Sequence, residues 1–170
     1  ITIRPAAPAD LSQLAEIEAS ADALFADVFG PLDATGVSWS PESGEERAAA
    51  TGFILVAAHG PAEVVGFVHV LEAAGHAHLE QLSVRPTHAR RGIGRALVAS
   101  AVDGAAQRGY RRITLRTFAD VPWNAPFYAA CGFTVTPTSD DAFHRSLVET
   151  ERRLGLHRLG ERVEMIRTIA

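Results

Sequence analysis

The chain has 170 residues, which is enough for a sizeable hydrophobic core and most often makes one domain. No apolar run reaches the roughly 18 residues that a membrane-spanning helix needs, and the formal net charge of −4 argues against a general nucleic-acid binder. The single cysteine excludes an internal disulfide. Together with an N-terminus that lacks a basic-then-apolar leader, it leads us to expect a cytoplasmic protein.

The first third of the chain reads as mostly helical. Asp10 or a neighbour is expected to cap the first helix, and Gly30-Pro31 to end the second. Residues 30–44 form a loop whose length is often functional. In chain order we expect a strand over 2–4, helices over about 10–18 and 20–29, the loop, and a short helix over 45–50.

From Gly52 onward the apolar period is that of strands, and short turns predict an antiparallel meander. The helix over 92–108 has the strongest apolar stripe, and a strand–helix–strand unit of this length predicts parallel strands on either side of it. We expect strands over 53–58, 63–72, 76–84, 112–117, 132–135 and 162–169, and helices over 92–108, 124–130 and about 143–154. The pattern indicates an α/β or α+β fold with a mixed sheet.

Residues 79–97 join a buried strand, a basic loop with two glycines, and the first turn of the long helix. A helix N-terminus presents unpaired N–H groups and a partial positive charge, which suit a phosphate. Gly92 and Gly94 remove side chains that would keep an anion from the backbone. Full charges are added by Arg90, Arg91 and Arg95. The stretch therefore predicts a pyrophosphate site for a nucleotide-like cofactor.

Two common nucleotide motifs do not fit this loop. The dinucleotide fingerprint wants Gly or Ala where Leu97 stands, and it places the loop directly after the strand, whereas residues 85–91 separate Val84 from Gly92 here. A Walker-type loop needs a lysine, and all 16 basic residues of this chain are arginine. A nicotinamide or ATP site is therefore disfavoured.

Two motifs together resemble the GNAT superfamily of N-acetyltransferases. The segment 90–97, preceded by 82–86, resembles the acetyl-CoA motif of that family, and the segment 124–133 resembles its second signature, an asparagine followed by a helix with Tyr and then Gly-Phe. Ala89 stands where the family usually has Gln or Arg. The resemblance implies one acyl-CoA N-acyltransferase domain over 1–170, with a GNAT-type mixed, mostly antiparallel twisted sheet of about seven strands flanked by helices.

The resemblance also implies where acetyl-CoA, as co-substrate, would bind. Pantetheine would pair with the strand before the loop, like an added strand, and the pyrophosphate would accept hydrogen bonds from the loop. The cofactor-binding residues expected on this basis are Leu82, Ser83, Val84, Arg90, Arg91, Gly92, Ile93, Gly94, Arg95 and Asn124.

Acetyl transfer to an amine needs a base for the ammonium and an acid for the departing thiolate. Tyr128 matches the family tyrosine that protonates the thiolate, and a phenol with a pKa near 10 is protonated at neutral pH. Glu80 is the expected base, because the family often places a carboxylate on this strand. His78, His69 and Glu72 are the alternatives.

Other chemistry is less well supported. Cys131 invites a ping-pong thiol mechanism, but it sits beside Gly132-Phe133 without an activating His–Asp pair, so we interpret it as a small buried residue. The seven histidines show no paired Cys or carboxylate spacing, so we expect no metal site.

Acceptor specificity is expected in three segments, 20–29, 30–44 and 121–123. Acidic residues there favour a cationic amine or a peptide N-terminus, although a solvated acidic surface explains them as well. These residues are Asp22, Asp27, Asp33 and Glu42.

We therefore predict an enzyme that transfers acetyl directly from acetyl-CoA to a primary amine in one ternary complex. The alternatives are a GNAT-fold module that binds acetyl-CoA without turnover, as a sensor or interaction domain, and an anion- or nucleotide-binding protein unrelated to acetyl transfer. Tyr128 favours the enzyme. We expect a small-molecule or peptide amine as partner and no nucleic acid or membrane, and we allow for a homodimer.

Overall fold

The computed structural model describes all 170 residues and contains one seven-stranded sheet in the order β1-β2-β3-β4-β5-β7-β6. Neighbouring strands are antiparallel except β4 and β5, which are parallel. This confirms the mixed, mostly antiparallel sheet. The strands are β1 (Thr2–Pro5), β2 (Gly52–His59), β3 (Glu63–Ala73), β4 (His76–Val84), β5 (Arg112–Phe118), β6 (Thr134–Thr136) and β7 (Arg162–Thr168).

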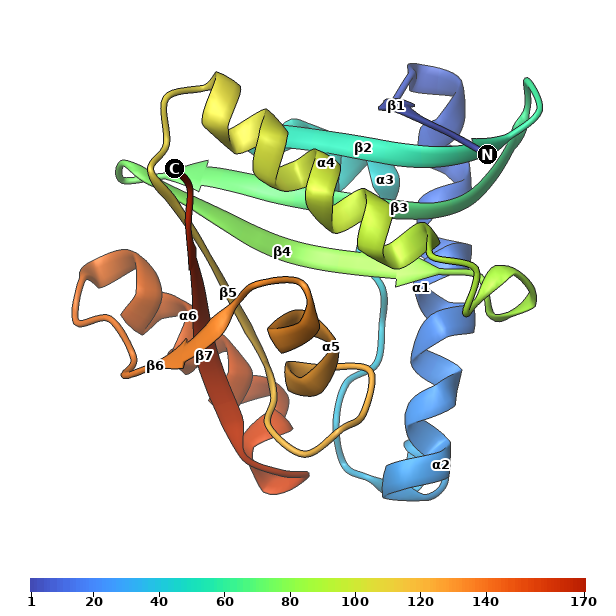
Figure 1. Cartoon of the computed structure of the whole chain (residues 1–170). Helices are drawn as coiled ribbons and strands as arrows, with labels where there is room; N and C mark the ends of the chain where they lie inside the picture. The colour runs from blue at the N-terminus through green and yellow to red at the C-terminus, as the bar shows by residue number, and fades with distance from the viewer.

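Helices cover both faces of the sheet: α4 and α5 lie in front of it in Figure 1, and α1 and α6 lie behind it. None of them is long and apolar enough to cross a membrane. The helices are α1 (Leu14–Asp22), α2 (Ala26–Phe29), α3 (Gly44–Ala49), α4 (Ile93–Gln107), α5 (Ala125–Ala130) and α6 (Ala142–Leu154). Short 3-10 turns occupy Pro8–Gln13, Ala23–Phe25, Leu32–Ala34, Pro86–His88 and Leu156–Arg158.

The larger hydrophobic core lies between the sheet and the helices α4 and α5. The predicted apolar stripe of α4 is buried throughout, and burial of each large side chain contributes about 1.5–3 kcal/mol. The stripe consists of Ile93, Leu97, Val98, Ala101, Val102 and Ala105. This packing fixes the N-terminus of α4 beside the end of β4.

A second core holds α1 against the other face of the sheet. Leu14 and Ile17 of α1 are fully buried against Phe67 and its neighbours on β2 and β3. Residues four apart lie on one side of a helix, so Glu18 and Asp22 continue the row that Leu14 begins. Packing of the apolar first turn therefore carries two carboxylates toward the middle of the sheet.

The sheet splits between β4 and β5. The two strands pair only over Ala77–Leu79 and Ile113–Leu115 and then diverge, as Figure 1 shows. Residues 80–84 of β4 consequently have a strand neighbour on one side only. At the same point His69 pairs with Gln81 and Val70 pairs with Leu79, so Glu80 is the extra residue of a β-bulge.

The differences from the sequence-based expectations are local. Asp10 is not the helix cap, because its carboxylate accepts from the Ala7 amide at 2.7 Å and pairs with Arg4 at 2.6 Å. The 3-10 turn Ala23–Phe25 interrupts the helix expected over 20–29. The strand expected over 132–135 begins only at Thr134, because Gly132 has a φ of +91°, a left-handed conformation that follows α5.

Candidate active site

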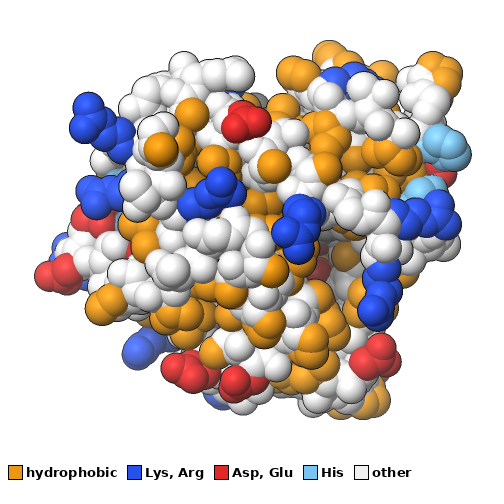
Figure 2. All heavy atoms as spheres, viewed as in Figure 1, with side chains coloured by type: hydrophobic (Ala, Val, Ile, Leu, Met, Phe, Trp, Pro, Cys, Tyr) orange, Lys and Arg blue, Asp and Glu red, His pale blue; other side chains and the backbone are white.

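A cleft of about 990 Å³ opens where β4 and β5 separate. One part, here named the loop half, is lined by residues 82–84 of β4, the loop before α4, the first turn of α4, and Phe127. The other part, named the carboxylate half, is lined by five acidic residues and three arginines. These are Glu18, Asp22, Glu42, Glu80, Glu151, Arg47, Arg116 and Arg162. Figure 2 shows a hollow on this face, with basic side chains around the start of α4.

The loop half contains a run of unpaired backbone donors. No acceptor within the protein receives a hydrogen bond from the amides of residues 90–95, whereas the Ala96 amide already bonds to the Gly92 carbonyl at 3.0 Å. These amides surround the N-terminus of a 15-residue helix. The arrangement matches the anion site expected from the sequence.

The two glycines of the loop differ in how strongly their positions require glycine. Gly92 has a φ of +79° with open space around an added Cβ, so it is the backbone conformation that requires glycine. A Cβ on Gly94 would lie 3.4 Å from the Phe127 ring, an ordinary contact. Gly92 is therefore the position where the shape of the loop depends most on the absence of a side chain.

The arginines of the loop do not all face the cleft. Arg90 and Arg95 line it, and Arg91 is exposed outside it. Arg95 donates to the Ala130 carbonyl at 3.2 Å, and Arg85 pairs with Glu16 at 2.9 Å, away from the loop. Two of the three predicted arginines are thus placed beside the unpaired amides.

The free edge of β4 completes the loop half. Leu82, Ser83 and Val84 line the cleft, and their strand pairs with β3 on one side only. The buried Ser83 hydroxyl accepts from the side-chain amide of Gln81 at 3.0 Å and so turns toward its own strand. This edge therefore presents backbone N–H and C=O groups to a ligand, as expected from the sequence.

Tyr128 reaches the cleft from α5 and is only 9% exposed. Its hydroxyl has no hydrogen-bond partner within the protein, and it is not among the polar atoms sealed from solvent. Burial raises the pKa of Tyr128 above its usual value of 10, so the hydroxyl is protonated at neutral pH. Asn124 lines the cleft and accepts from the Phe118 amide at 3.2 Å, which ties the start of α5 to the end of β5.

Glu80 is a half-buried carboxyl group without a hydrogen bond or ion pair in the protein. Burial raises its pKa from 4.5 to about 7, although the nearby Arg47 acts in the opposite direction. The bulge in β4 places this side chain at the point where the strands divide. A carboxyl group with such a pKa can both take and return a proton near neutral pH.

The alternative bases are less suited to that task. Burial lowers the pKa of His78 to about 3, and its Nδ1 lies 2.8 Å from the Thr114 hydroxyl. Burial also lowers the pKa of His69 to about 4, and its Nδ1 accepts from Arg47 at 3.1 Å. Glu72 accepts from the Tyr110 hydroxyl at 2.9 Å and lies outside the cleft.

The three arginines of the carboxylate half already have acidic partners. Arg47, only 3% exposed, pairs with Glu18 at 2.8 Å and with Glu42 at 3.5 Å. Arg116 and Arg162 both pair with Glu151, at 2.5 and 2.6 Å. These pairs leave two carboxyl groups of the cleft without a basic partner, Asp22 and Glu80. Burial raises the pKa of Asp22 to about 7.

Aromatic rings form the wall next to Asp22. The centroid of the Phe25 ring lies 5.4 Å from that of Trp39, 5.5 Å from that of Trp123 and 5.8 Å from that of Phe118. All four side chains line the cleft, and Trp123 is partly exposed. The carboxylate half thus combines unpaired acidic groups with an aromatic surface.

The structure brings the three expected specificity segments to this half, but not all of their acidic residues. Asp22 and Glu42 line the cleft, whereas Asp27 and Asp33 are exposed outside it. Sequence reasoning missed the buried ion pairs completely. Arg47 is 29 residues from Glu18 along the chain, and no local pattern marks such a contact.

Cys131 is a buried member of the larger core, and burial raises the pKa of its thiol. Its thiol has no hydrogen-bond partner, since Arg167 donates to the Cys131 backbone carbonyl at 2.8 Å, and the residue does not line the cleft. These observations favour the interpretation as a core residue.

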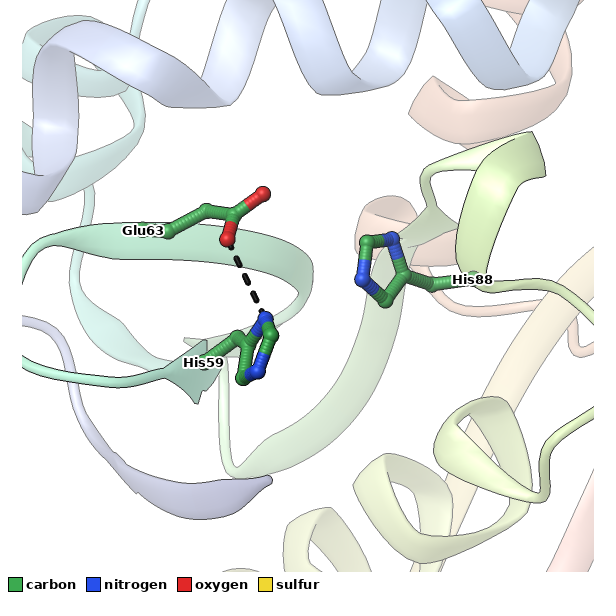
Figure 3. Close-up of side chains that lie close together, drawn as sticks. All are labelled: His59, Glu63 and His88. Carbon is green, nitrogen blue, oxygen red and sulfur yellow. Dashed lines mark ion pairs between the residues drawn. The ribbon is translucent and has the colours of Figure 1, made fainter.

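Two groups of three His and acidic residues lie close enough to share an ion, and one of them, His59, Glu63 and His88, is shown in Figure 3.

The acetyltransferase (GNAT) family model matches residues 20–133, well over half of the chain. Among solved structures, PaiA N-acetyltransferase from Thermoplasma acidophilum, in complex with coenzyme A, is 19% identical with a TM-score of 0.72, over 99% of this chain and 98% of that one. The ribosomal-protein-S18-alanine N-acetyltransferase of Escherichia coli is 19% identical with a TM-score of 0.65, over 99% and 94%. An aminoglycoside 6'-N-acetyltransferase complexed with coenzyme A is 18% identical with a TM-score of 0.65, over 100% and 98%.

Proposed function

Because the chain belongs to the GNAT family of acetyltransferases, we propose that it transfers the acetyl group of acetyl-CoA to a cationic primary amine, directly and in one ternary complex. The observation that carries the proposal is the juxtaposition in one cleft of unpaired loop amides, a free strand edge, a protonated tyrosine and an unpaired carboxyl group. Each of these supplies one requirement of acetyl transfer.

The loop half fits acetyl-CoA. The unpaired amides of residues 90–95, with Arg90 and Arg95 beside them, would hold the pyrophosphate. The free edge of β4 at residues 82–84 would hold the pantetheine amides by adding them as a strand. Bound in this way, the co-substrate would bring an activated acyl group, a thioester, into the cleft that Glu80 and Tyr128 both line.

Glu80 and Tyr128 have the protonation states that the reaction needs. An amine enters as an ammonium ion and must lose a proton before its nitrogen can attack. Glu80, with a pKa of about 7, accepts that proton and returns it to solvent. Tyr128 donates its hydroxyl proton to the sulfur as the carbon–sulfur bond breaks, and the second proton, which the nitrogen loses on becoming an amide, restores the Tyr128 hydroxyl. The products are an amide, CoA thiol and one released proton.

The carboxylate half supports a cationic acceptor with an apolar body. Each arginine there already has an acidic partner: Arg47 pairs with Glu18 and Glu42, and Arg116 and Arg162 share Glu151, so an acceptor carboxylate would have to compete with these ion pairs. Asp22 and Glu80 lack a counter-ion, and a positive charge between them would offset their burial. The rings around Phe25 would pack on the acceptor and attract its charge.

Direct transfer is supported by the absence of a suitable nucleophile in the cleft. The only thiol is Cys131, which is buried in the core with a raised pKa. A ping-pong route would need an accessible thiolate close to the thioester. Replacement of Cys131 by alanine should therefore leave turnover within about twofold of the original.

Release of free CoA thiol from acetyl-CoA, measured across amines, amino acids, peptides and aminoglycosides, tests the proposal. We expect turnover with cationic amines that carry an apolar group, little with amino acids, and intersecting double-reciprocal lines. Parallel lines would exclude the ternary complex. Thermal stabilisation by CoA without turnover on any amine would instead indicate a binding module, and stabilisation by ATP or NAD but not CoA would exclude the assigned co-substrate.

A further inference from the structure

Three potential metal ligands converge on the surface outside the catalytic part of the cleft. His59 and Glu63 are the last register pair of the β2–β3 ladder, and His88 ends the 3-10 turn that leads into the loop half. Figure 3 shows the three side chains facing a common space. The Nδ1 of His59 lies 3.2 Å from a carboxylate oxygen of Glu63, and the two imidazole centroids are 5.9 Å apart.

The geometry is close to that of a bound ion. The ligand atoms of the three side chains all lie within 4.8 Å of one another. A tetrahedral zinc ion with bonds of about 2.0–2.2 Å needs ligand atoms roughly 3.4 Å apart. Small side-chain rotations can close that difference. The three backbones would stay in place meanwhile, since strand pairing or a 3-10 turn holds them.

The ligands are also free to bind. The Nδ1 of His88 lies 3.0 Å from the Thr87 hydroxyl, which orients the ring and leaves Nε2 available, as second-shell partners do for metal-bound histidines. His59 and Glu63 are 61% and 52% exposed, so water can fill the remaining coordination position. The His59 and His88 rings meet edge to face at 62°, which brings His88 toward the His59–Glu63 pair.

The second group, His76, Asp141 and His144, is less suitable. Both ring nitrogens of the buried His144 are already engaged, Nδ1 with Asp141 at 2.7 Å and Nε2 with the Thr114 hydroxyl at 3.0 Å. This group is a partly buried hydrogen-bond network at the opposite end of β4. It provides a matched histidine for comparison.

We propose that His59, Glu63 and His88 bind a divalent transition-metal ion of the zinc type, with two imidazoles and one carboxylate as ligands. The ion links the β2–β3 turn to the segment just before the pyrophosphate loop, because His88 is two residues before Arg90 and itself lines the cleft. Binding of the ion therefore holds residues 86–92 in place. Neither the binding of the ion nor its effect on residues 86–92 depends on acetyl transfer.

Calorimetric titration of the untagged, chelator-treated protein with zinc chloride alone tests the site. We expect one ion per chain, with affinity reduced by on the order of tenfold or more in each of His59→Gln, Glu63→Gln and His88→Gln. The His76→Gln variant serves as control and should bind as the original protein does. Absence of binding, or a loss that follows His76→Gln and not His59→Gln, would overturn the proposal.

Amide hydrogen exchange tests the link to the loop. Zinc should slow exchange of the amides of residues 87–92 in the original protein and leave it unchanged in His59→Gln. Equal exchange with and without zinc in the original protein would refute the link. Both readouts are independent of turnover, so their failure is distinguishable from a failure of the proposed acetyltransferase activity.

Discussion

The two halves of the cleft differ in which part of the chain lines them, backbone groups in the loop half and side chains in the carboxylate half. The loop half uses backbone groups from one continuous stretch, the free edge of β4 and the amides of residues 90–95. The carboxylate half uses side chains that arrive from several separate elements, such as Glu18 on α1, Glu80 on β4 and Glu151 on α6. A backbone site depends on local conformation, and a side-chain site depends on how the elements pack.

The electrostatics of the two halves differ for the same reason. The loop half attracts an anion through unpaired amides, the helix dipole and two exposed arginines, at little cost in burial. The carboxylate half holds acidic groups that burial makes weaker acids, so Glu80 and Asp22 both titrate near pH 7. The conformation of the loop half and the pKa values in the carboxylate half can therefore be changed independently by mutation.

Replacing Tyr128 by phenylalanine should have the largest effect. Loss of a general acid costs typically about 10²- to 10⁴-fold in rate, and the ring itself remains to fill the core. We expect kcat to fall by about 10²-fold or more, with the KM for acetyl-CoA almost unchanged, in steady-state assays of thiol release. Tyr110→Phe is the matched control, because its hydroxyl bonds to Glu72 outside the cleft. Equal turnover in Tyr128→Phe and the original protein would remove Tyr128 as the acid.

Replacing Glu80 by glutamine should lower kcat by about 10²-fold and change the pH profile. The base acts when ionised, so kcat of the original protein should rise with pH up to about 7 and then level off. Glutamine cannot ionise, so this rise should disappear. Saturating rates from pH 5.5 to 9 check it. A rise near pH 7 that persists in Glu80→Gln would assign the titration to another group.

The sequence predicted the strand, loop and helix that form the loop half, because these elements are contiguous. Gly92 needs a left-handed conformation, and the strand, loop and helix that surround it follow one another in the chain. It did not predict the ion pairs of Arg47 and Arg116, which form between residues 29 and 35 positions apart once α1, α3 and α6 have packed. The bulge at Glu80 was also missed, since strand alternation alone assumes unbroken pairing.

Replacing Gly92 by alanine should affect the loop half alone. A residue with a Cβ at a φ of +79° is strained by about 1–2 kcal/mol, which corresponds to roughly 5- to 30-fold if the loop relaxes out of its binding shape. We expect the KM for acetyl-CoA to rise about tenfold. Gly109→Ala, at a φ of +89° beyond the other end of α4, should lose stability without that change. An unchanged KM in Gly92→Ala would place the phosphate elsewhere.

Replacing Asp22 by asparagine should produce the smallest effect, a gain in stability that depends on pH. The folded protein keeps the Asp22 proton up to a pH of about 7, whereas the unfolded chain releases it near its usual value of 3.8. Between these values the folded state binds more protons, so the stability that this group contributes falls as pH rises through the window and stays low above it.

Asparagine cannot ionise, so Asp22→Asn should melt above the original protein at pH 8 and at the same temperature near pH 4. Relief of about 1 kcal/mol would raise Tm by roughly 2–4 °C for a chain of this size. Melting curves across this pH range, with the exposed Asp27→Asn as control, measure the difference. A saturating cationic acceptor should narrow the gap at pH 8, because it binds the ionised carboxylate of the original protein and not the amide. If the difference in Tm between Asp22→Asn and the original protein changed neither with pH nor with the acceptor, Asp22 would not be the buried carboxyl group of the acceptor site.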